Sequence, residues 1–236
     1  MTAVFKREFK AFFTSPVGYA VMAVLFCFAG LFFGVYNLSG GMADLTGVFS
    51  GLFSIVLLLV LPILTMRLFS DDKRQKTDQA LLTAPTSLTG IVMGKFLSAV
   101  LMFAISLSIT IVFAVIVAMQ VTPDWMVIIG NFVGLMLLGG MIISIGILIS
   151  SLTESQFVAA LGTFVVSFML MMLDNVKAIF SSVSWIGTVV DFLSVYQRYT
   201  NFTIGVIHYD DIVFFLSIQA LFIFLTVRVL DRKRWS

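Results

Sequence analysis

Charged side chains are scarce in this sequence, and their scarcity excludes an ordinary soluble domain. Asp, Glu, Lys and Arg together make up 11% of the 236 residues, hydrophobic residues make up 60%, and the mean hydropathy is +1.12. Soluble domains usually contain about 25% charged residues. The composition therefore predicts an integral membrane protein.

Reactive side chains are also rare, and the motifs of common enzymes are absent. The single cysteine, Cys27, lies in an apolar run, so no disulfide can form within the chain. His208, the only histidine, has no second His or Cys ligand near it, and Asp210 is interpreted as the cap of the last helix. There is no P-loop, H-E-x-x-H or G-x-S-x-G motif. We therefore expect no catalytic, cofactor-binding or metal-binding residue.

Long apolar runs, by contrast, are abundant. Six of them can cross a hydrocarbon core of about 30 Å as helices, although the fifth is short. No stretch alternates as a strand would, and in lipid a helix satisfies its own backbone groups. We expect residues 1–236 to form a single all-α transmembrane domain. The predicted spans are residues 17–37, 47–66, 91–119, 126–150, 156–173 and 211–230.

Charge is missing from the interiors of these spans. With Lys95 counted in the polar segment before the third span, and Asp211 and Arg228 counted with the ends of the last span, no interior contains Asp, Glu, Lys, Arg or His. Ion-coupled transporters normally need such a group, so an ion-coupled carrier or channel is disfavoured. Asn131 and Gln219 are polar exceptions, for which we predict hydrogen bonds between helices.

Basic residues are distributed unevenly between the two sides of the predicted bundle. Of the 14 Lys and Arg residues, only Lys177 and Arg198 fall on the side opposite to the termini. Because cytoplasmic segments are enriched in Lys and Arg, both termini and the segment 67–95 are expected to be cytoplasmic.

Residues 2–14 have the pattern of an amphipathic helix. Four aromatic side chains recur on one face, and Lys6, Arg7, Glu8 and Lys10 occupy the rest. Such a helix lies in the plane of the membrane interface, although an extension of the first span is the alternative. The residues expected to contact the membrane interface are Phe5, Phe9, Phe12 and Phe13.

Residues 67–95, RLFSDDKRQKTDQALLTAPTSLTGIVMGK, form the one long polar segment. A helix is predicted over 70–82, because Ser70 or Asp71 can cap its start and Pro85 stops it. So short and polar a helix is marginal in water by itself, which favours a docking element. An ordinary solvated loop helix is the alternative.

Two further connections contain more than simple loops. In the turn 150–156, Thr153 and Gln156 have the spacing of a capping box, and Glu154 is expected to face the cytoplasm, either as a second partner contact or merely within a cap. Residues 174–210 are too apolar to face water alone. We predict helical pieces at 176–181 and 184–193 that re-enter the outer leaflet or cover the outer mouth of the bundle.

Three G-x-x-x-G patterns permit close approach of helices, within the chain or between two copies. They occur at Gly30 and Gly34, at Gly47 and Gly51, and at Gly130 and Gly134. In a chain with 17 glycines the pattern is too common to assign an interface.

Three groups of short motifs occur in order along nearly the whole chain. The first comprises residues 71–74 (DDKR), 77–85 (TDQALLTAP) and 91–95 (IVMGK). The second is the turn 150–156 (SSLTESQ). The third comprises Phe202, Gly205, Val206 and residues 209–212 (YDDI) and 225–228 (LTVR). Together these motifs resemble those of ABC-2 type permeases, most closely the gliding-motility branch. The sequence departs from the broader family at Lys76, where Gly is usual, and at Gln79, where Glu is usual.

The resemblance implies a six-span bundle of the ABC-2 (type V) exporter kind in a bacterial plasma membrane, with an interface helix, a coupling helix after the second span and re-entrant helices before the last. It also implies a separate ABC ATPase that holds ATP and Mg²⁺, and a second permease half, identical or related. Members of the gliding-type branch often work beside a membrane protein with a large extracytoplasmic part. The residues that would couple to the ATPase are Asp71, Asp72, Lys73, Arg74, Asp78, Gln79, Leu82 and Glu154.

Two interpretations of function follow from these features. The first is the permease of an ABC exporter, and the second is a membrane scaffold that recruits cytoplasmic partners without transport. The sequence does not select a substrate: lipid, peptide, polysaccharide and drug remain open.

Overall fold

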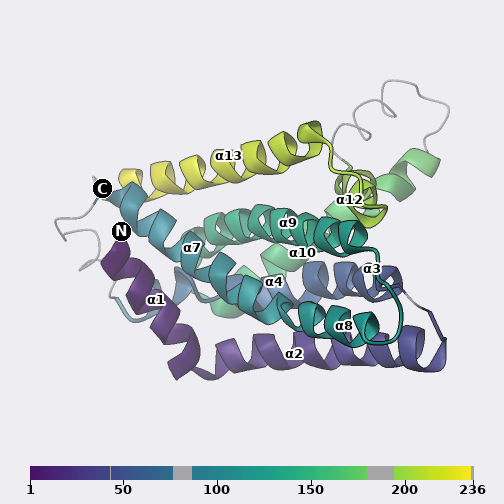
Figure 1. Ribbon diagram of the computed structural model, residues 1–236. Helices are drawn as coiled ribbons and strands as arrows, with labels where there is room; N and C mark the ends of the chain where they lie inside the picture. The colour runs from purple at the N-terminus through teal and green to yellow at the C-terminus, as the bar shows by residue number, and fades with distance from the viewer. Residues whose placement is uncertain (43, 77–86, 180–193, 235–236) are drawn as a thin grey trace.

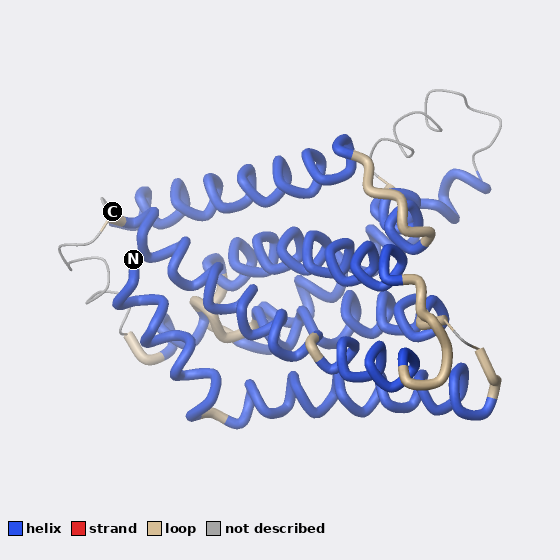
Figure 2. The backbone as a smooth tube through the Cα atoms, viewed as in Figure 1, coloured by secondary structure: helices blue, strands red, loops and turns tan. Residues whose placement is uncertain are grey.

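The computed structural model describes residues 1–42, 44–76, 87–179 and 194–234, with side chains up to 173 and up to 232 in the last two ranges. Every regular element within these ranges is a helix (Figure 1, Figure 2). The elements are α1 (Thr2–Thr14), α2 (Pro16–Phe33), η1 (Gly34–Ser39), α3 (Thr46–Ile55), η2 (Val56–Val60), α4 (Leu61–Thr65), α5 (Ser70–Arg74), α7 (Leu88–Leu107), α8 (Ile109–Ala118), α9 (Trp125–Leu152), α10 (Gln156–Ile179), α12 (Val195–Thr203) and α13 (Tyr209–Arg234).

The prediction of six apolar spans is confirmed. Among the described residues, six helical segments are long and apolar enough to cross a membrane. The two termini lie at the same end of the bundle, and α12 lies at the opposite end (Figure 1). The segments are Pro16–Ser39, Thr46–Arg74, Leu88–Ala118, Trp125–Leu152, Gln156–Leu173 and Tyr209–Arg232.

The second and third spans are interrupted helices. In the second span, the π-helical turn η2 directly precedes α4, whose second residue is Pro62. A proline ring crowds the carbonyl of the fourth residue before it and has no N–H to donate, so a wider turn relieves the contact. In the third span, Ser108 separates α7 from α8.

The long helix α9 lies at the centre of the bundle and packs against α13, α12, α10, α7 and α4 (Figure 1). Glycines on different sides of α9 allow this, because a Cβ atom would meet a neighbouring element. At Gly146 it would lie 2.5 Å from Thr65 Oγ1, and at Gly130 it would lie 2.7 Å from the carbonyl oxygen of Phe202. The other such contacts are Gly134 with Phe202, Gly139 with Phe103 and Gly140 with Gln219.

The predicted hydrogen bonds of Asn131 and Gln219 are confirmed. The buried Asn131 accepts a hydrogen bond from the hydroxyl of Tyr199 in α12 at 3.2 Å. Gln219 in α13 donates to the carbonyl of Leu137 in α9 at 3.0 Å. Both amides therefore join other helices to α9.

The G-x-x-x-G patterns have different surroundings. Gly47 and Gly51 let α3 approach the aromatic rings of Tyr36 and Phe32, and Gly130 and Gly134 let α9 approach α12. At Gly30 and Gly34, in contrast, no described atom would lie within 4 Å of an added Cβ. Within the described part of the chain, the patterns on α3 and α9 thus allow close packing of helices, and the pattern at Gly30 and Gly34 does not contribute to it.

The region before the last span differs from its prediction. The piece predicted at 176–181 falls largely within α10, which continues to Ile179, whereas the piece predicted at 184–193 lies outside the described residues. Helix α12 was not predicted. It is tied to α13 by an ion pair between Arg198 and the buried Asp211, 2.9 Å apart. Since α13 begins at Tyr209, Asp210 lies inside its first turn and is not the cap.

We predict that Gly130→Ala destabilises the protein, because the new methyl group would collide with the backbone of α12. Overpacking of this kind costs about 1–3 kcal/mol. The matched control is Gly30→Ala, where the methyl group enters open space. Thermal unfolding in detergent should show a lower midpoint for Gly130→Ala only; equal midpoints for the two variants would contradict the packing of α12 on α9.

Candidate functional site

Helix α1 is a separate helix that packs on α7 at the end of the bundle that holds the termini. Ser15 is extended, and α2 starts at Pro16, so α1 is not an extension of the first span. A Cβ at Gly94 of α7 would lie 3.1 Å from Val4, which shows how closely the two helices approach. The helix predicted at 2–14 is therefore present, with bounds that match the pattern.

The aromatic face of α1 is not uniform. Phe5, Phe9 and Phe13 are half-buried, and contact of these three rings with lipid stays a prediction. Phe12 is 1% exposed and lies under the guanidinium of Arg67, whose Cζ is 5.0 Å from the ring centroid. The expectation that Phe12 contacts the membrane interface is therefore wrong, because this ring packs inside the protein.

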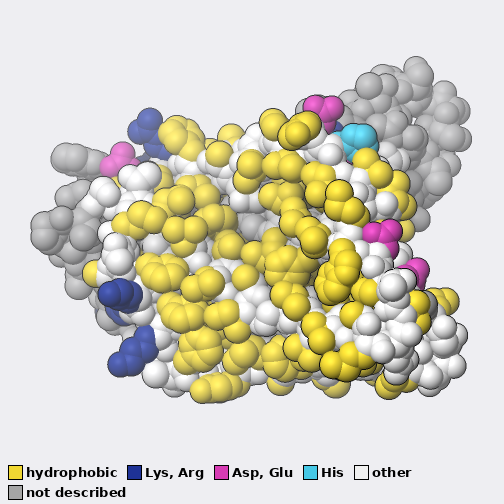
Figure 3. Space-filling view, viewed as in Figure 1, with side chains coloured by type: hydrophobic (Ala, Val, Ile, Leu, Met, Phe, Trp, Pro, Cys, Tyr) yellow, Lys and Arg dark blue, Asp and Glu magenta, His cyan; other side chains and the backbone are white. Residues whose placement is uncertain are grey.

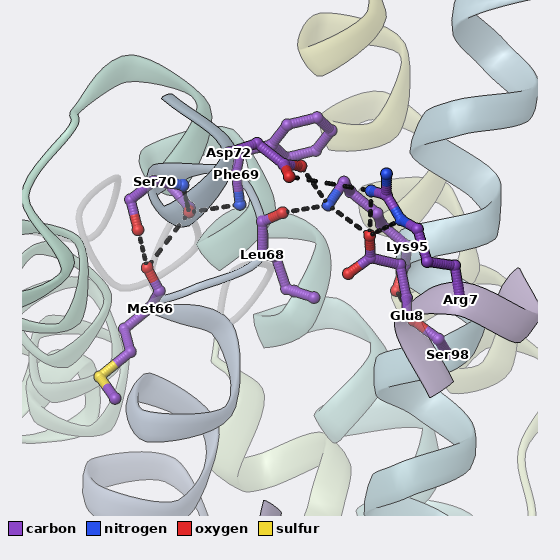
Figure 4. A network of polar contacts seen from close by, with 10 residues as sticks. Arg7, Glu8, Met66, Leu68, Phe69, Ser70, Asp72, Lys95 and Ser98 are labelled. Carbon is purple, nitrogen blue, oxygen red and sulfur yellow. Dashed lines mark hydrogen bonds and ion pairs between the residues drawn. The ribbon is translucent and has the colours of Figure 1, made fainter. Parts of the chain in front are cut away.

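A cluster of four charged side chains joins α1, α5 and α7 (Figure 4). Lys95 is 1% exposed, and its Nζ lies 3.0 Å from Glu8 Oε1 and 2.7 Å from Asp72 Oδ2. Nζ also donates a hydrogen bond to the carbonyl of Leu68. Arg7 lies 2.5 Å from Glu8 and 3.8 Å from Asp72. We refer to Arg7, Glu8, Asp72 and Lys95 as the charge cluster.

The charge cluster is electrically balanced, which allows its burial. Two cations and two carboxylates lie within ion-pair distance, and each carboxylate contacts both cations. The contact of Lys95 with Asp72 is an ion pair whose angles fall outside those of a hydrogen bond. Desolvation lowers the pKa of Arg7, but the hydrogen bond to Glu8 and the charges of Glu8 and Asp72 outweigh it, so the net pKa is raised. Arg7 stays protonated.

The position of Lys95 corrects one expectation from the sequence. Lys95 was counted in the polar segment, but it lies inside α7, within the third apolar span. The span interiors are therefore not all free of charge.

The position of Glu8 corrects a second expectation. Glu8 was placed on the polar face of residues 2–14, yet it points inward to Lys95. Its spacing from Phe5 and Phe12, which puts the three residues on one helix face, is the signal that could have revealed this.

Segment 66–74, which contains α5, is also tied to the C-terminal end of α9. Ser150 Oγ accepts hydrogen bonds from the backbone N–H groups of Phe69 and Ser70, both at 3.0 Å. It donates to the carbonyl of Met66 at 3.3 Å. One serine thus holds three backbone groups in the turn that leads into α5.

Two side chains of α5 contact the end of α9 and the start of α10. Lys73 donates to the carbonyl of Ser151, and the Asp71 carboxylate accepts a hydrogen bond from the Gln156 side chain. The capping box predicted for Thr153 and Gln156 is therefore not formed as expected. Instead, Ser155 precedes α10 and its Oγ accepts from the N–H of Val158 at 3.5 Å, while Thr153 Oγ1 accepts from the N–H of Ser155 at 3.1 Å.

The helix predicted over 70–82 is not continuous. Helix α5 ends at Arg74, and Lys76 has a φ of 56°, a left-handed conformation that stops a right-handed helix. The rest of the predicted helix, with Asp78, Gln79 and Leu82, lies outside the described residues. Glycine adopts this left-handed conformation without the steric cost that a side chain brings, so Lys76 is an unusual residue at this point of the chain.

The proposed coupling residues therefore divide into two groups. Asp71, Asp72 and Lys73 contact other segments of this chain. Arg74 and Glu154 are exposed, on α5 and on the adjacent α9–α10 turn. Of the predicted coupling residues that the structure describes, only Arg74 and Glu154 are therefore placed to meet a partner without first breaking internal contacts.

We predict that Lys95→Met destabilises the protein by about 3–5 kcal/mol, because it leaves two carboxylates without their buried partner. Equilibrium unfolding in detergent measures this change. Lys6→Met, which alters an exposed lysine of α1, is the control and should change stability by less than about 0.5 kcal/mol. The triple variant Lys95→Met, Glu8→Gln, Asp72→Asn should recover part of the loss, and equal effects of Lys95→Met and Lys6→Met would refute the charge cluster.

The comparisons with known proteins identify the family of the chain. No group of three or more His, Cys, Asp or Glu side chains that could hold a metal ion occurs in the part of the chain that the structure describes. A search of curated proteins finds no match. The family profile described as "ABC-2 family transporter protein" matches residues 2–235; the gliding-motility branch stays a prediction. With its six apolar helices, the chain belongs to the ABC-2 family of transporter proteins.

Proposed function

We propose that this chain is the permease of an ABC exporter, and that it couples to a separate ATPase through α5 and the α9–α10 turn. Family membership supports a transmembrane subunit of an ABC transporter. ATP and Mg²⁺ would bind to the partner, because the sequence has no P-loop. Asp78, Gln79 and Leu82 are retained as proposed contacts on the basis of the resemblance alone.

The observation that carries this proposal is the set of contacts around α5. On one side, Asp72 meets Lys95 of α7 and Arg7 of α1, and on the other, Lys73 meets the end of α9. These contacts are ion pairs and hydrogen bonds that include buried groups, so a push on the exposed side of α5 directly reaches the transmembrane helices α7 and α9 and the helix α1. A loop helix with only solvated contacts would lack such connections.

The distribution of charge supports a cytoplasmic position for this end. On the face shown in Figure 3, the Lys and Arg side chains lie mainly at the end that holds the termini, beyond a broad apolar region. Because Lys and Arg favour cytoplasmic segments, we propose that α5 and both termini face the cytoplasm of a bacterial cell. A second permease half, either a copy of this chain or a related protein, would complete the pathway.

Reversal of the two exposed charges tests the coupling surface. We expect the double variant Arg74→Glu, Glu154→Arg, reconstituted with its ATPase in nanodiscs, to reduce permease-dependent ATP turnover about tenfold, a loss of about 1.4 kcal/mol in association. The control is Arg232→Glu, which reverses an exposed charge near the C-terminal end of α13, at the same end of the molecule as α5. The folded fraction of each variant is measured by size-exclusion chromatography.

Two results would contradict the proposal. One is a failure of any P-loop ATPase to co-purify with the chain, and the other is turnover that the double variant leaves unchanged. Replacement of Asp71, Asp72 and Lys73 by Ala is a poorer test, because each of these residues also holds the permease together.

A scaffold without transport is distinguished by the dependence of export on ATP hydrolysis. If the chain is an exporter, cells with the wild-type permease and an ATPase-dead partner should fail to export the same compounds as cells without the permease. A scaffold would leave export unchanged while the complex still assembles.

A further inference from the structure

A cavity of about 390 Å³ lies between α3, α10 and α12, at the end of the bundle opposite to the termini. Its size is at the lower end of the range for small-molecule sites, about 300–1,000 Å³. It is separate from the charge cluster and has no role in the proposed coupling surface. The lining residues are Ser50, Phe53, Ser54, Met171, Met172, Tyr196, Tyr199, Thr200 and Thr203.

One wall of the cavity is aromatic. The rings of Phe53 and Tyr199 are stacked with centroids 4.7 Å apart, and Tyr196 meets Phe53 edge to face at 5.6 Å. The hydroxyl of Tyr199 is already used, because it donates to Asn131. Burial raises the pKa of Tyr199, so this phenol stays neutral. Tyr196 is 49% exposed and offers its ring to the opening.

The aliphatic hydroxyl groups of the lining mostly present hydrogen-bond acceptors. Ser50 donates its proton to the carbonyl of Thr46 at 2.8 Å, Thr200 to Tyr196 at 2.6 Å, and Thr203 to Thr200 at 2.6 Å. Each oxygen keeps lone pairs for a ligand that can donate. A ligand with several O–H groups fits this arrangement better than one with acceptors alone.

Charge is absent from the lining. The guanidinium of Arg198, also on α12, is turned to α13, where it pairs with Asp211 and lies 4.1 Å from the ring centroid of Phe214. An ionic ligand would therefore have no counter-charge among the described lining residues. Taking a charge out of water without a partner is costly, so the cavity selects against ions.

An exposed apolar track continues from the cavity along α10. Met169 and Phe168, one turn from Met172, are 63% and 44% exposed, and Val165 and Leu161 follow at helical spacing. An alkyl chain can lie along such a track while a polar headgroup occupies the cavity. The track alone would not identify a ligand, but together with the hydroxyl and aromatic lining it defines an amphiphile.

We infer that this cavity binds the uncharged, hydroxyl-rich headgroup of an amphiphile, such as a sugar or polyol on an alkyl chain. Sugar C–H groups would pack on the exposed ring of Tyr196, which Phe53 supports from behind, and sugar O–H groups would donate to Ser50, Thr200 and Thr203. The assignment of this molecule as exported cargo rests on the proposed function, whereas its binding in the cavity is argued from the lining residues and the apolar track alone.

Photocrosslinking tests the inference directly. The purified full chain in phosphatidylcholine nanodiscs is irradiated with a diazirine derivative of octyl glucoside, and crosslinked peptides are mapped by mass spectrometry. We expect crosslinks in α3, α10 and α12 that excess octyl glucoside removes. Octyl sulfate and octyl trimethylammonium at the same concentration should not remove them.

Two substitutions in α3 separate filling of the cavity from loss of a hydroxyl group. Ser54→Phe should nearly abolish the crosslinks by occupying the space, whereas Ser50→Ala, which removes one of the proposed acceptors, should weaken competition by octyl glucoside about threefold to tenfold. Ser217→Phe, at an exposed serine of α13 outside the cavity, is the control and should change nothing.

Equal competition by the three probes, crosslinks outside these helices, or an unchanged signal with Ser54→Phe would overturn the inference. These outcomes are independent of the ATPase assay. Binding with no ATPase coupling would leave the cavity assigned and refute only the exporter.

Discussion

The buried ammonium group of Lys95 sets the positions of three segments of this protein at once. Lys95 is only 1% exposed, so solvent can contribute little to stabilising its charged group. Glu8 of α1, Asp72 of α5 and the carbonyl of Leu68 stabilise it instead. Because a buried ion is tolerated only with well-placed partners, α1 and α5 cannot move from α7 independently without exposing or orphaning a charge. The charge cluster therefore makes one mechanical unit of α1, α5 and α7.

Helix α9 connects this unit with the opposite end of the molecule. Ser150 near its end holds the backbone before α5, and Asn131 near its start holds Tyr199 of α12. These two residues are about 28 Å apart along a helix with a rise of 1.5 Å per residue. Glycines on several sides let neighbours pack against its backbone, so α9 shares close contacts with both ends. Under the proposed function, α9 is the direct physical link between the coupling surface and the cavity.

The polar segment shows how a local conflict in sequence is resolved by structure. Its composition favours a helix through residue 82, yet the backbone turns left-handed at Lys76. An L-residue pays about 1–2 kcal/mol for that conformation, which the contacts of Asp71, Asp72 and Lys73 with neighbouring helices can offset. Charged residues that propensity rules assign to a solvated surface helix are thus used to fasten the segment to the bundle.

Hydropathy by itself determined the six spans, because lipid leaves an apolar segment only the hydrogen-bonded helix. It also determined the roles of Asn131 and Gln219, because a buried amide finds a partner only on a neighbouring helix. The amphipathic pattern predicted the helix at 2–14 in the same way. The tertiary structure alone decided that Glu8, Phe12 and Lys95 turn inward and that α12 closes over α9. Periodicity shows which residues share a helix face, but whether that face meets lipid, water or protein depends on partners far away in the chain.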